Sequence, residues 1–494
     1  MLNSVNYIKH GGQDMLIGRE KEIAELEEIF QSDEAELVAV YGRRRVGKTY
    51  LINEVFRDRF VFTHAGLSPV EVNDSAKITN KRMKEQLLHF YQSLILNGLK
   101  PTKKPTSWLE AFYLLETLLI QKDDGKRQVV FLDEIQWMDT PKSGFITGLE
   151  AFWNSWACKR HNLMIIVCGS STSWILEKLI NNHGGLYDRV TKQIHLKAFD
   201  LCETEKYLVS QGINYSRYDV VQTYMSLGGV PYYLKCMDRT KSYAQNMDSL
   251  FCESNSPLRN EFDRLFSSLF SNPTMMKNII VAIGKKKRGL TRKEIIDELK
   301  ITDSGALSKF LNALIEGEFI FKYAPFDSDK RIEYYKLIDP FCIFYLHFFN
   351  DEKRITKWST VIDSQECVVF RGLAFENVCF NHIKQIKNAL GISGVSTEES
   401  LWTKKEENEG TQIDLVIDRK DNIIDLCEVK FLNDEFAVTK DYHQVLMRRK
   451  NLVQNAVSKK KSVQNVLITT YGLKRNEYYW DFSNVITIDD LFKE

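Results

Sequence analysis

The chain has 494 residues, 44% hydrophobic and 27% charged, and its 67 basic side chains nearly cancel 66 acidic ones to leave a formal net charge of +1. This composition, with few prolines, excludes collagen-like, low-complexity and disordered chains. At about 100 to 200 residues per domain, the length predicts three or four compact units. Because the total charge is near zero, nucleic-acid binding would have to come from local basic patches.

The cysteine pattern and the lack of long apolar runs indicate the cellular compartment of the protein. The nine cysteines are an odd number, widely scattered and without a C-x-x-C pair, which is typical of buried thiols in a reducing environment. Residues 1 to 15 lack the apolar segment of a signal peptide, and no run of about 18 apolar residues occurs. We therefore expect a soluble, cytoplasmic protein without a membrane partner.

A phosphate-binding motif follows the first predicted strand. Residues 36 to 41 are short, apolar and rich in valine, and residues 50 to 56 have helical spacing. Between them lies G-x-x-x-x-G-K-[ST] in the strand, loop, helix context that this motif requires. The motif consists of Gly42, Arg43, Arg44, Arg45, Val46, Gly47, Lys48 and Thr49.

The residue types of this motif suit a nucleotide. The two glycines let consecutive N–H groups point inward and form an anion nest at a helix N-terminus. Lys48 would reach the β and γ phosphates, and the Thr49 hydroxyl would bind Mg²⁺. The alternative is a glycine-rich turn without a ligand, which the flanking strand and helix disfavour.

A second predicted strand, residues 129 to 132, ends in two acids. A P-loop enzyme needs a carboxylate for its metal ion and a group that orients the attacking water. We expect Asp133 to bind Mg²⁺ and Glu134 to act as the base. A strand can also end in acids because it reaches solvent, but the preceding P-loop favours the functional interpretation.

Two further polar groups could complete this site. The predicted strand at 163 to 168 ends in Gly169-Ser170-Ser171, and either serine could lie near the γ-phosphate; a simple Gly-Ser turn is equally compatible. Arg189 could contact phosphate within the chain or from a neighbouring subunit, whereas an exposed arginine with no such role is the simpler interpretation.

These segments together resemble the archaeal-type ATPases related to AAA+ and STAND signalling NTPases. The resemblance rests on IGRE (17 to 20), GRRRVGKT, VFLDEIQW (130 to 137), the GSS strand end and GGVP (228 to 231), and it covers roughly residues 15 to 260. It implies a RecA-like α/β core and a helical lid, with Gly18 and Arg19 near the base and the G-x-P segment near the nucleotide. Asp188 departs from the small residue expected before the arginine, which weakens the case for Arg189.

The middle of the chain has the order of a winged helix. Three helical segments follow Thr274, and two strands, 319 to 323 and 332 to 337, flank a polar turn at Asp327 to Lys330. The third helix carries Lys309 against Glu316, which gives little attraction for phosphate. The basic loop 285 to 288 could contact a nucleic-acid backbone or could simply be solvated, and the sequence favours neither.

One acid in the C-terminal region lies on the apolar stripe of its own predicted helix. Glu376 shares that stripe with Leu373, Cys379, Phe380 and Ile383. A carboxylate there is costly unless a cation or hydrogen-bond donors accompany it. Glu376 is therefore a candidate functional residue.

A predicted hairpin, 411 to 418 and 423 to 431, carries two more acids. If Arg419 pairs with Ile423 around a three-residue loop, Asp414 lies opposite Glu428 and shares a face with Lys430. The other face, which begins with Ile413 and Leu415, would be almost wholly apolar. Two facing carboxylates need a divalent cation between them to stay ionised, and the lysine could orient or deprotonate a water.

This pattern is similar to the PD-(D/E)XK nuclease superfamily over roughly residues 365 to 470. The resemblance implies that Asp414 and Glu428 bind Mg²⁺ or Mn²⁺, that Glu376 assists, that Lys430 activates water, and that Gln444 contacts the site. The alternative is an ordinary half-buried hairpin with D, E and K on its solvent side. A nearby basic surplus favours a polyanion partner: Lys440, Arg448, Arg449, Lys450, Lys459, Lys460, Lys461, Lys474 and Arg475 oppose Asp441 and Glu477 over residues 436 to 477.

The sequence thus predicts an α/β protein of four units. They are a RecA-like P-loop core (1 to 200), a helical lid (201 to 270), a winged helix (271 to 345) and a restriction-endonuclease-like α/β domain (346 to 494). We expect an ATP-hydrolysing switch or motor whose C-terminal domain acts on nucleic acid, with ATP and Mg²⁺ as cofactors. The alternative is a STAND-like regulatory ATPase whose nuclease-like domain is inactive and only binds DNA or a partner. DNA versus RNA, the trigger, homo-oligomer formation and the biological process stay open.

Overall fold

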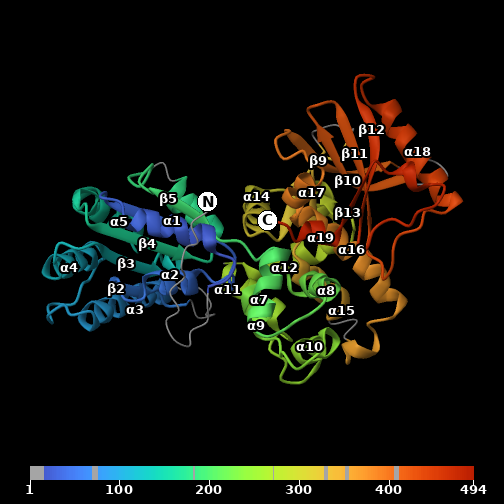
Figure 1. The fold of residues 1–494 in the computed structure, drawn as a ribbon. Helices are drawn as coiled ribbons and strands as arrows, with labels where there is room; N and C mark the ends of the chain where they lie inside the picture. The colour runs from blue at the N-terminus through green and yellow to red at the C-terminus, as the bar shows by residue number, and fades with distance from the viewer. Residues whose placement is uncertain are drawn as a thin grey trace, which may run out of the picture.

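The computed structural model describes residues 16–68, 76–181, 184–270, 272–326, 332–350, 355–404 and 411–494. The N-terminal segment 1 to 15 and the predicted polar turn at 327 to 330 lie outside the described residues. Figure 1 shows two lobes, one built on the first sheet and the other on the remaining helices and sheets.

The first lobe is a five-stranded sheet with helices on both faces. Its strands are β1 (Glu36–Tyr41), β2 (Phe60–Ala65), β3 (Gln128–Asp133), β4 (Leu163–Gly169) and β5 (Lys192–His195). Its helices are α1 (Glu20–Phe30), α2 (Lys48–Phe56), α3 (Ala76–Leu96), α4 (Trp108–Gln121), α5 (Phe145–Ser155) and α6 (Thr172–Ile175). All strand pairs are parallel, in the order β2-β3-β4-β1-β5, so the predicted parallel P-loop core is confirmed.

The apolar strands of this sheet are buried because helices cover both of their faces. Leu37 and Ala39 of β1 join one hydrophobic cluster, with α3, α4 and α5, while Val38 and Val40 join the other, with α1 and α2. Strand β4 lies between β1 and β3. Since carboxyl ends of parallel strands share one edge, the P-loop after β1 and the acids after β3 come together there.

The second lobe contains the remaining elements. Its first part holds α7 (Leu201–Ser210), α8 (Arg217–Leu227), α9 (Pro231–Lys235), α10 (Tyr243–Met247), α11 (Glu261–Leu269), α12 (Pro273–Gly284), β6 (Leu290–Thr291), α13 (Arg292–Leu299), α14 (Gly305–Glu316), β7 (Ile320–Tyr323) and β8 (Tyr334–Leu337). Its second part holds α15 (Pro340–Phe348), α16 (Gln365–Asn381), α17 (Ile383–Ala389), β9 (Thr397–Lys404), β10 (Thr411–Arg419), β11 (Ile423–Lys430), α18 (Lys440–Ala456), β12 (Ser462–Thr469), β13 (Asn484–Thr487) and α19 (Ile488–Leu491). Single turns of 3-10 or π helix join several elements: η1 (Ile135–Trp137), η2 (Ala157–Lys159), η3 (Leu176–Ile180), η4 (Asp248–Cys252), η5 (Trp358–Thr360) and η6 (Tyr479–Asp481).

The middle region has the predicted order of three helices and a hairpin. Helix α13 begins with a capping box between Thr291 and Glu294, as the sequence indicates. Strands β6, β8 and β7 form a small antiparallel sheet in that order. Strand β6 ties the start of α13 to β8, so the loop before β6 is held to this sheet.

The C-terminal sheet combines a hairpin with two parallel strands, in the order β13-β12-β11-β10-β9. The predicted hairpin register is confirmed from Leu415↔Cys427 to Asp418↔Ile424, and Asn422 takes φ +68° in the loop. The prediction that Ile413 shares the face of Leu415 is wrong. An irregularity in the β9–β10 pairing between Ile413 and Val416 shifts Ile413 into the cluster that contains Val416.

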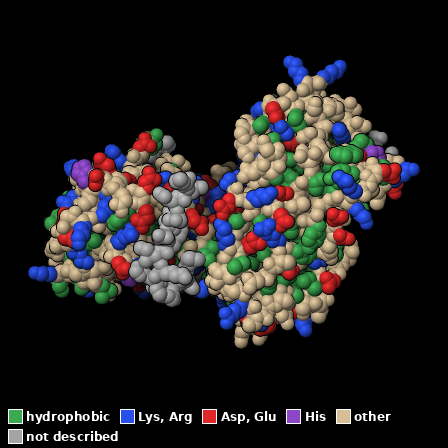
Figure 2. All heavy atoms as spheres, viewed as in Figure 1, with side chains coloured by type: hydrophobic (Ala, Val, Ile, Leu, Met, Phe, Trp, Pro, Cys, Tyr) green, Lys and Arg blue, Asp and Glu red, His purple; other side chains and the backbone are tan. Residues whose placement is uncertain are grey.

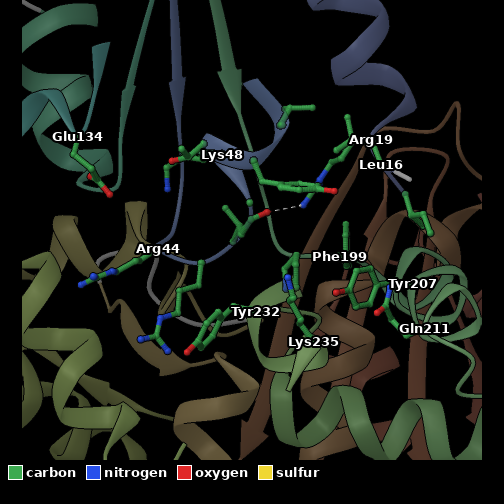
Figure 3. Close-up of a pocket in the computed structure, with 18 residues that line it drawn as sticks. Leu16, Arg19, Arg44, Lys48, Glu134, Phe199, Tyr207, Gln211, Tyr232 and Lys235 are labelled. Carbon is green, nitrogen blue, oxygen red and sulfur yellow. Dashed lines mark hydrogen bonds between the residues drawn. The ribbon is translucent and has the colours of Figure 1, made fainter. Parts of the chain in front are cut away.

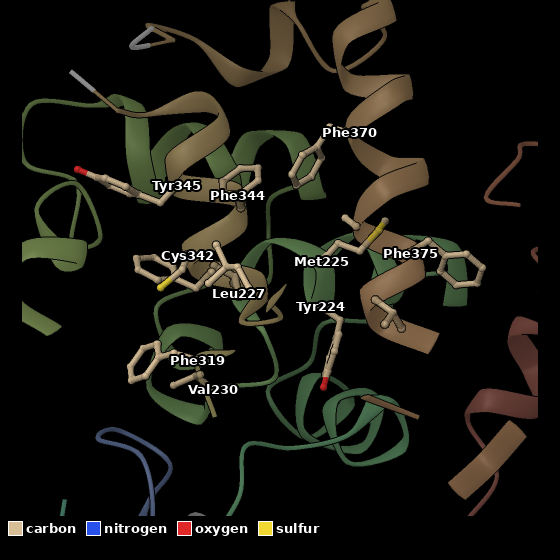
Figure 4. Close-up of a cluster of buried hydrophobic side chains, with 14 of the residues drawn as sticks. Tyr224, Met225, Leu227, Val230, Phe319, Cys342, Phe344, Tyr345, Phe370 and Phe375 are labelled. Atoms are coloured by element: carbon tan, nitrogen blue, oxygen red, sulfur yellow. The ribbon is translucent and has the colours of Figure 1, made fainter. Parts of the chain in front are cut away.

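One large hydrophobic cluster runs through the second lobe (Figure 4), and two smaller clusters lie in its C-terminal part. Figure 4 shows Tyr224 and Met225 of α8 in the large cluster together with Phe344 of α15 and Phe370 of α16. The same cluster continues to Leu415 in the C-terminal sheet. This core is therefore shared by the three units predicted at 201 to 270, 271 to 345 and 346 to 494. A displacement of one unit would be transmitted to the others through the packed side chains.

The surface carries charges of both signs on the face shown in Figure 2. Basic and acidic side chains are interspersed on this face. Basic side chains project from the upper tip of the second lobe. No helix among the described residues combines the length and apolarity needed to cross a bilayer. The nine cysteines, all of them described, are not joined in disulfide bonds, and most are buried.

Candidate functional site

A cavity of about 340 Å³ lies over the P-loop. In Figure 3, Lys48 and Glu134 lie toward one end of it, and Phe199, Tyr207 and Gln211 lie toward the other. The first end offers a cation and a carboxylate, and the second offers aromatic faces and an amide. A cavity with one charged and one aromatic end matches a nucleotide, whose phosphates and base differ in the same way.

The P-loop backbone depends on its two glycines. Gly42 has φ +144°, and a Cβ there would lie 2.1 Å from the Leu196 carbonyl oxygen. Gly47, with φ +95°, caps α2. The buried Lys48 ammonium donates to the carbonyl oxygens of Gly42 and Arg43, both at 2.9 Å. The lysine is therefore held over the loop, where phosphate oxygens could replace these carbonyls.

Thr49 and Asp133 meet beneath the phosphate end of the cavity. The Thr49 hydroxyl donates to Asp133 Oδ2 at 2.7 Å. Burial raises the pKa of Asp133, against the hydrogen bond from Thr49. Two hard oxygen ligands side by side suit Mg²⁺, which takes only one or two protein ligands and keeps several waters. The residues present thus fit the predicted metal ion, although the ion itself stays a prediction.

Glu134 is held in place by the neighbouring strand. Its Oε2 accepts hydrogen bonds from the Ser170 hydroxyl at 2.8 Å, the Ser170 N–H at 3.2 Å and the Gln136 amide at 2.5 Å. Glu134 itself takes φ +46°, a strained conformation for a non-glycine residue. Of the two candidate serines, the structure thus brings Ser170 to the acid. Gln136 was missed, and its place two residues after Glu134 was the available signal.

The three P-loop arginines have different surroundings. Arg44 lines the cavity, as does Arg45, which also pairs with Glu261 at 2.5 Å and lies over the Tyr232 ring. The buried Arg43 side chain instead forms an ion pair with Asp339 at the start of α15. The Arg43 side chain therefore does not line the cavity, because a buried guanidinium needs a buried acid, and the predicted part of Arg43 in nucleotide binding stays a prediction.

Arg189 is not among the residues that line this cavity. It is exposed and follows Asp188, which takes φ +53°. The structure therefore gives Arg189 no role within its own chain among the described residues. A contact from a neighbouring subunit stays a prediction.

The second lobe brings the predicted C-terminal acids together, with an unpredicted lysine. Lys287, in the loop between α12 and β6, contacts Glu376 Oε1 at 2.7 Å and Asp414 Oδ1 at 3.4 Å. Burial, and then the charge of Asp414, raises the pKa of Glu376 to about 7. Burial, and then Glu428, also raises the pKa of Asp414. The basic loop 285 to 288 was predicted either to contact a nucleic-acid backbone or to be solvated. Neither role describes the contacts of Lys287 with two acids.

Glu428 has three partners from its own unit. Lys430 and Arg449 contact its two carboxylate oxygens at 2.6 and 2.7 Å, and the Tyr442 hydroxyl donates to it. Although burial opposes them, Lys430 and Arg449 lower the pKa of Glu428. The predicted Gln444 is exposed, and Tyr442 and Arg449 are the residues of α18 that reach the acid.

The charge state of Lys430 bears on its predicted role. Burial lowers its pKa, but Glu428 and Tyr442 outweigh burial and raise it above the ordinary value. A lysine that holds its proton orients a water or stabilises an anion, and it does not deprotonate a water. Among the described residues, no group of three or more His, Cys, Asp or Glu side chains is arranged to hold a metal ion. The metal ion predicted at Asp414 and Glu428 therefore stays a prediction.

The family comparison concerns the first lobe and the start of the second. Residues 16–237 match the model of a family described as an ATPase domain predominantly from Archaea. This region is therefore similar to that family of ATPase domains, in agreement with the parallel sheet and the P-loop at its edge.

Two curated relatives come from Methanocaldococcus jannaschii. An uncharacterized protein is 24% identical over 450 residues, which cover 89% of this chain and 92% of the relative. An uncharacterized ATP-binding protein is 23% identical over 317 residues, which cover 57% of this chain and 85% of the relative. The first similarity thus extends beyond the ATPase domain to most of the chain.

Two solved structures share a looser likeness. A Walker-type ATPase of Pyrococcus abyssi has a TM-score of 0.45 and 20% identity, over 67% of this chain and 96% of that one. The ORC2 protein of Aeropyrum pernix has a TM-score of 0.40 and 13% identity, over 69% of this chain and 95% of that one. Both TM-scores are below 0.5, so neither likeness bears on the function of this chain.

Proposed function

We propose that the protein is a Mg²⁺-dependent ATP-hydrolysing switch whose nucleotide state controls a nuclease-like site in the second lobe. The observation that carries the ATPase half is that Lys48, Thr49 and Glu134 line one cavity while Asp133 contacts Thr49 beside it. Each of these side chains matches a function that phosphoryl transfer requires.

Each of these residues has a distinct role in nucleotide binding or hydrolysis. The P-loop N–H groups and Lys48 bind the phosphates, and Thr49 with Asp133 holds the metal ion. Mg²⁺, when held by Thr49 and Asp133, would neutralise part of the phosphate charge. Glu134 orients the attacking water and accepts its proton, while Ser170 and Gln136 fix the direction of that carboxylate. Phe199 and Tyr207 offer aromatic faces to the base.

The P-loop arginines support coupling between the lobes. Arg43 pairs with Asp339, and Arg45 pairs with Glu261, so two positions of the loop are tied to the starts of α15 and α11. Asp339 is the second residue after β8, and β8 belongs to the small sheet of the middle region. A change in the P-loop on ATP binding or hydrolysis would therefore be passed to the second lobe, whose elements share one core.

The nuclease half is supported by the convergence of Glu376, Asp414, Glu428 and Lys430 in the C-terminal unit. Acids from a helix and from two adjacent strands come together, and Lys430 contacts Glu428. Carboxylate oxygens are the ligands that Mg²⁺ and Mn²⁺ prefer. Basic residues of α18 and the segments beside it would attract a nucleic-acid backbone.

A second candidate is a STAND-like regulatory ATPase whose C-terminal domain only binds DNA or a partner. The observation that favours it is that each of the three acids already has a basic partner, Lys287 for two of them and Lys430 and Arg449 for the third. Divalent-metal binding that depends on Asp414 separates the two candidates, because a binding-only domain has no need of it.

The ATP-binding half is tested by Lys48→Ala. Removing the ammonium leaves the phosphates without their main side-chain cation, so we expect ATP affinity to fall by about 10- to 100-fold. Titration with a fluorescent ATP analogue, with and without Mg²⁺, measures this. Lys126→Ala, at an exposed lysine of the same lobe that does not line the cavity, is the matched control. Equal affinity of Lys48→Ala and the unaltered protein would refute ATP binding at this loop.

A further inference from the structure

We infer that the Lys287 ammonium is a removable occupant of the cation position between Glu376 and Asp414, and that its loop must leave before a divalent ion binds there. The inference rests on the proposed metal site of the C-terminal unit. It adds that the middle region keeps this site closed.

The position of Lys287 is that of a cation bound by two carboxylates. Its Nζ lies 2.7 Å from Glu376 Oε1 and 3.4 Å from Asp414 Oδ1, although these acids come from a helix and a strand of another unit. A divalent ion between the two acids would occupy the same place and neutralise the same charges. The two cations are therefore mutually exclusive.

The site retains an unused ligand atom. Glu376 is about 6% exposed, and its Oε2 is buried with no hydrogen-bond partner among the described residues. The Lys287 ammonium thus contacts one of the two oxygens of this carboxylate, and the buried Lys336 acts on its charge from nearby. A buried, unpartnered carboxylate oxygen is costly and points to a ligand that uses both oxygens.

Lys287 belongs to a different unit from the two acids, which indicates that its side chain can be withdrawn from them. The side chain is one-third exposed and reaches the acids from the solvent side, whereas Lys430 and Arg449 belong to the C-terminal unit itself. Its neighbours Lys286 and Arg288 pair with Glu294 of α13. The loop is therefore fastened to the middle region and would move with it.

A continuous path joins this loop to the nucleotide site. The loop leads into β6, which pairs with β8 at Leu290↔Tyr335. Asp339 lies just beyond β8 and pairs with Arg43 of the P-loop. A shift of β8 that follows the P-loop would displace Lys287 from the acids, so the nucleotide could open the site.

The test is Mn²⁺ binding to nucleotide-free, full-length protein at pH 8, followed by the electron paramagnetic resonance signal of free Mn²⁺. We expect Lys287→Met, which keeps the aliphatic stem, to bind Mn²⁺ at least about tenfold more tightly than the unaltered protein. The gain should disappear in Lys287→Met with Asp414→Asn. Lys285→Ala, an exposed lysine of the same loop paired with Glu298, should bind like the unaltered protein.

The outcomes separate the inference from the proposed function. If Asp414→Asn abolishes Mn²⁺ binding but Lys287→Met leaves the affinity unchanged, the occupant role is wrong and the metal site stands. If Asp414→Asn changes nothing in either background, the metal site fails, and the inference fails with it. Thermal unfolding gives a second measure, since Mn²⁺ should raise the midpoint of Lys287→Met more than that of the unaltered protein. Lys287→Gln supplies the same comparison should Lys287→Met not fold.

Discussion

Glu134→Gln is expected to lower ATP turnover by about 10²- to 10⁴-fold while ATP binding stays nearly unchanged. The amide keeps the size of the side chain but cannot accept a proton from the attacking water. The contacts of Lys48 and Thr49 are untouched, so the phosphates and the metal ion should still be held. Steady-state phosphate release gives the turnover, and titration with labelled ATP gives the affinity.

Two comparisons sharpen this experiment. Ser170→Ala removes the hydroxyl that fixes Glu134 at 2.8 Å, so it should lower turnover by less than Glu134→Gln does. Glu85→Gln alters an exposed acid of α3 and should leave turnover unchanged. Turnover of Glu134→Gln within about threefold of the unaltered protein would exclude Glu134 as a base that contributes the usual 10²- to 10⁴-fold.

Asp339→Ala is expected to destabilise the protein by about 3 to 5 kcal/mol, because it leaves the buried Arg43 guanidinium without its partner. The change also removes the carboxylate that caps α15 by accepting from the Cys342 N–H at 2.7 Å. Because Arg43 belongs to the P-loop, ATP affinity should fall as well. Urea unfolding with and without ATP measures both effects.

The matched control for this ion pair is the double variant Arg43→Met with Asp339→Ala. Removing both charges avoids an unpaired buried ion, so the double variant should be more stable than the sum of the two single changes predicts. A loss below about 0.5 kcal/mol for Asp339→Ala would place it among ordinary surface substitutions and contradict the coupling assigned to the pair.

The sequence was sufficient to predict the local features of the fold. The strand, loop and helix around Gly42 and Gly47, the acids after β3 and the hairpin register around Asn422 depend on residues close together in the chain. Hydrophobic periodicity and motif spacing report such features directly. The Asp133 and Glu134 side chains lie where the ends of parallel strands place them.

What the sequence did not predict depends on contacts between distant segments. The pairing of Arg43 with Asp339 joins residues 296 positions apart, and Lys287 reaches an acid 127 positions away. No local pattern encodes such pairs, so the sequence indicated no partner for Arg43 and left the role of the loop that carries Lys287 open. The shared core of the second lobe was missed for the same reason, since its three parts each have their own apolar residues.

The measurement that tests the central claim most directly is cleavage of end-labelled single- and double-stranded DNA and RNA with Mg²⁺ or Mn²⁺, with and without ATP. The account predicts cleavage of at least one substrate that requires a divalent ion, changes with ATP, and is lost in Asp414→Asn. It also predicts that the ATP effect is lost in Lys48→Ala, whose C-terminal site is intact. Cleavage that survives Asp414→Asn together with Glu428→Gln, or that is absent under every condition including Lys287→Met, would contradict a nucleotide-controlled nuclease site.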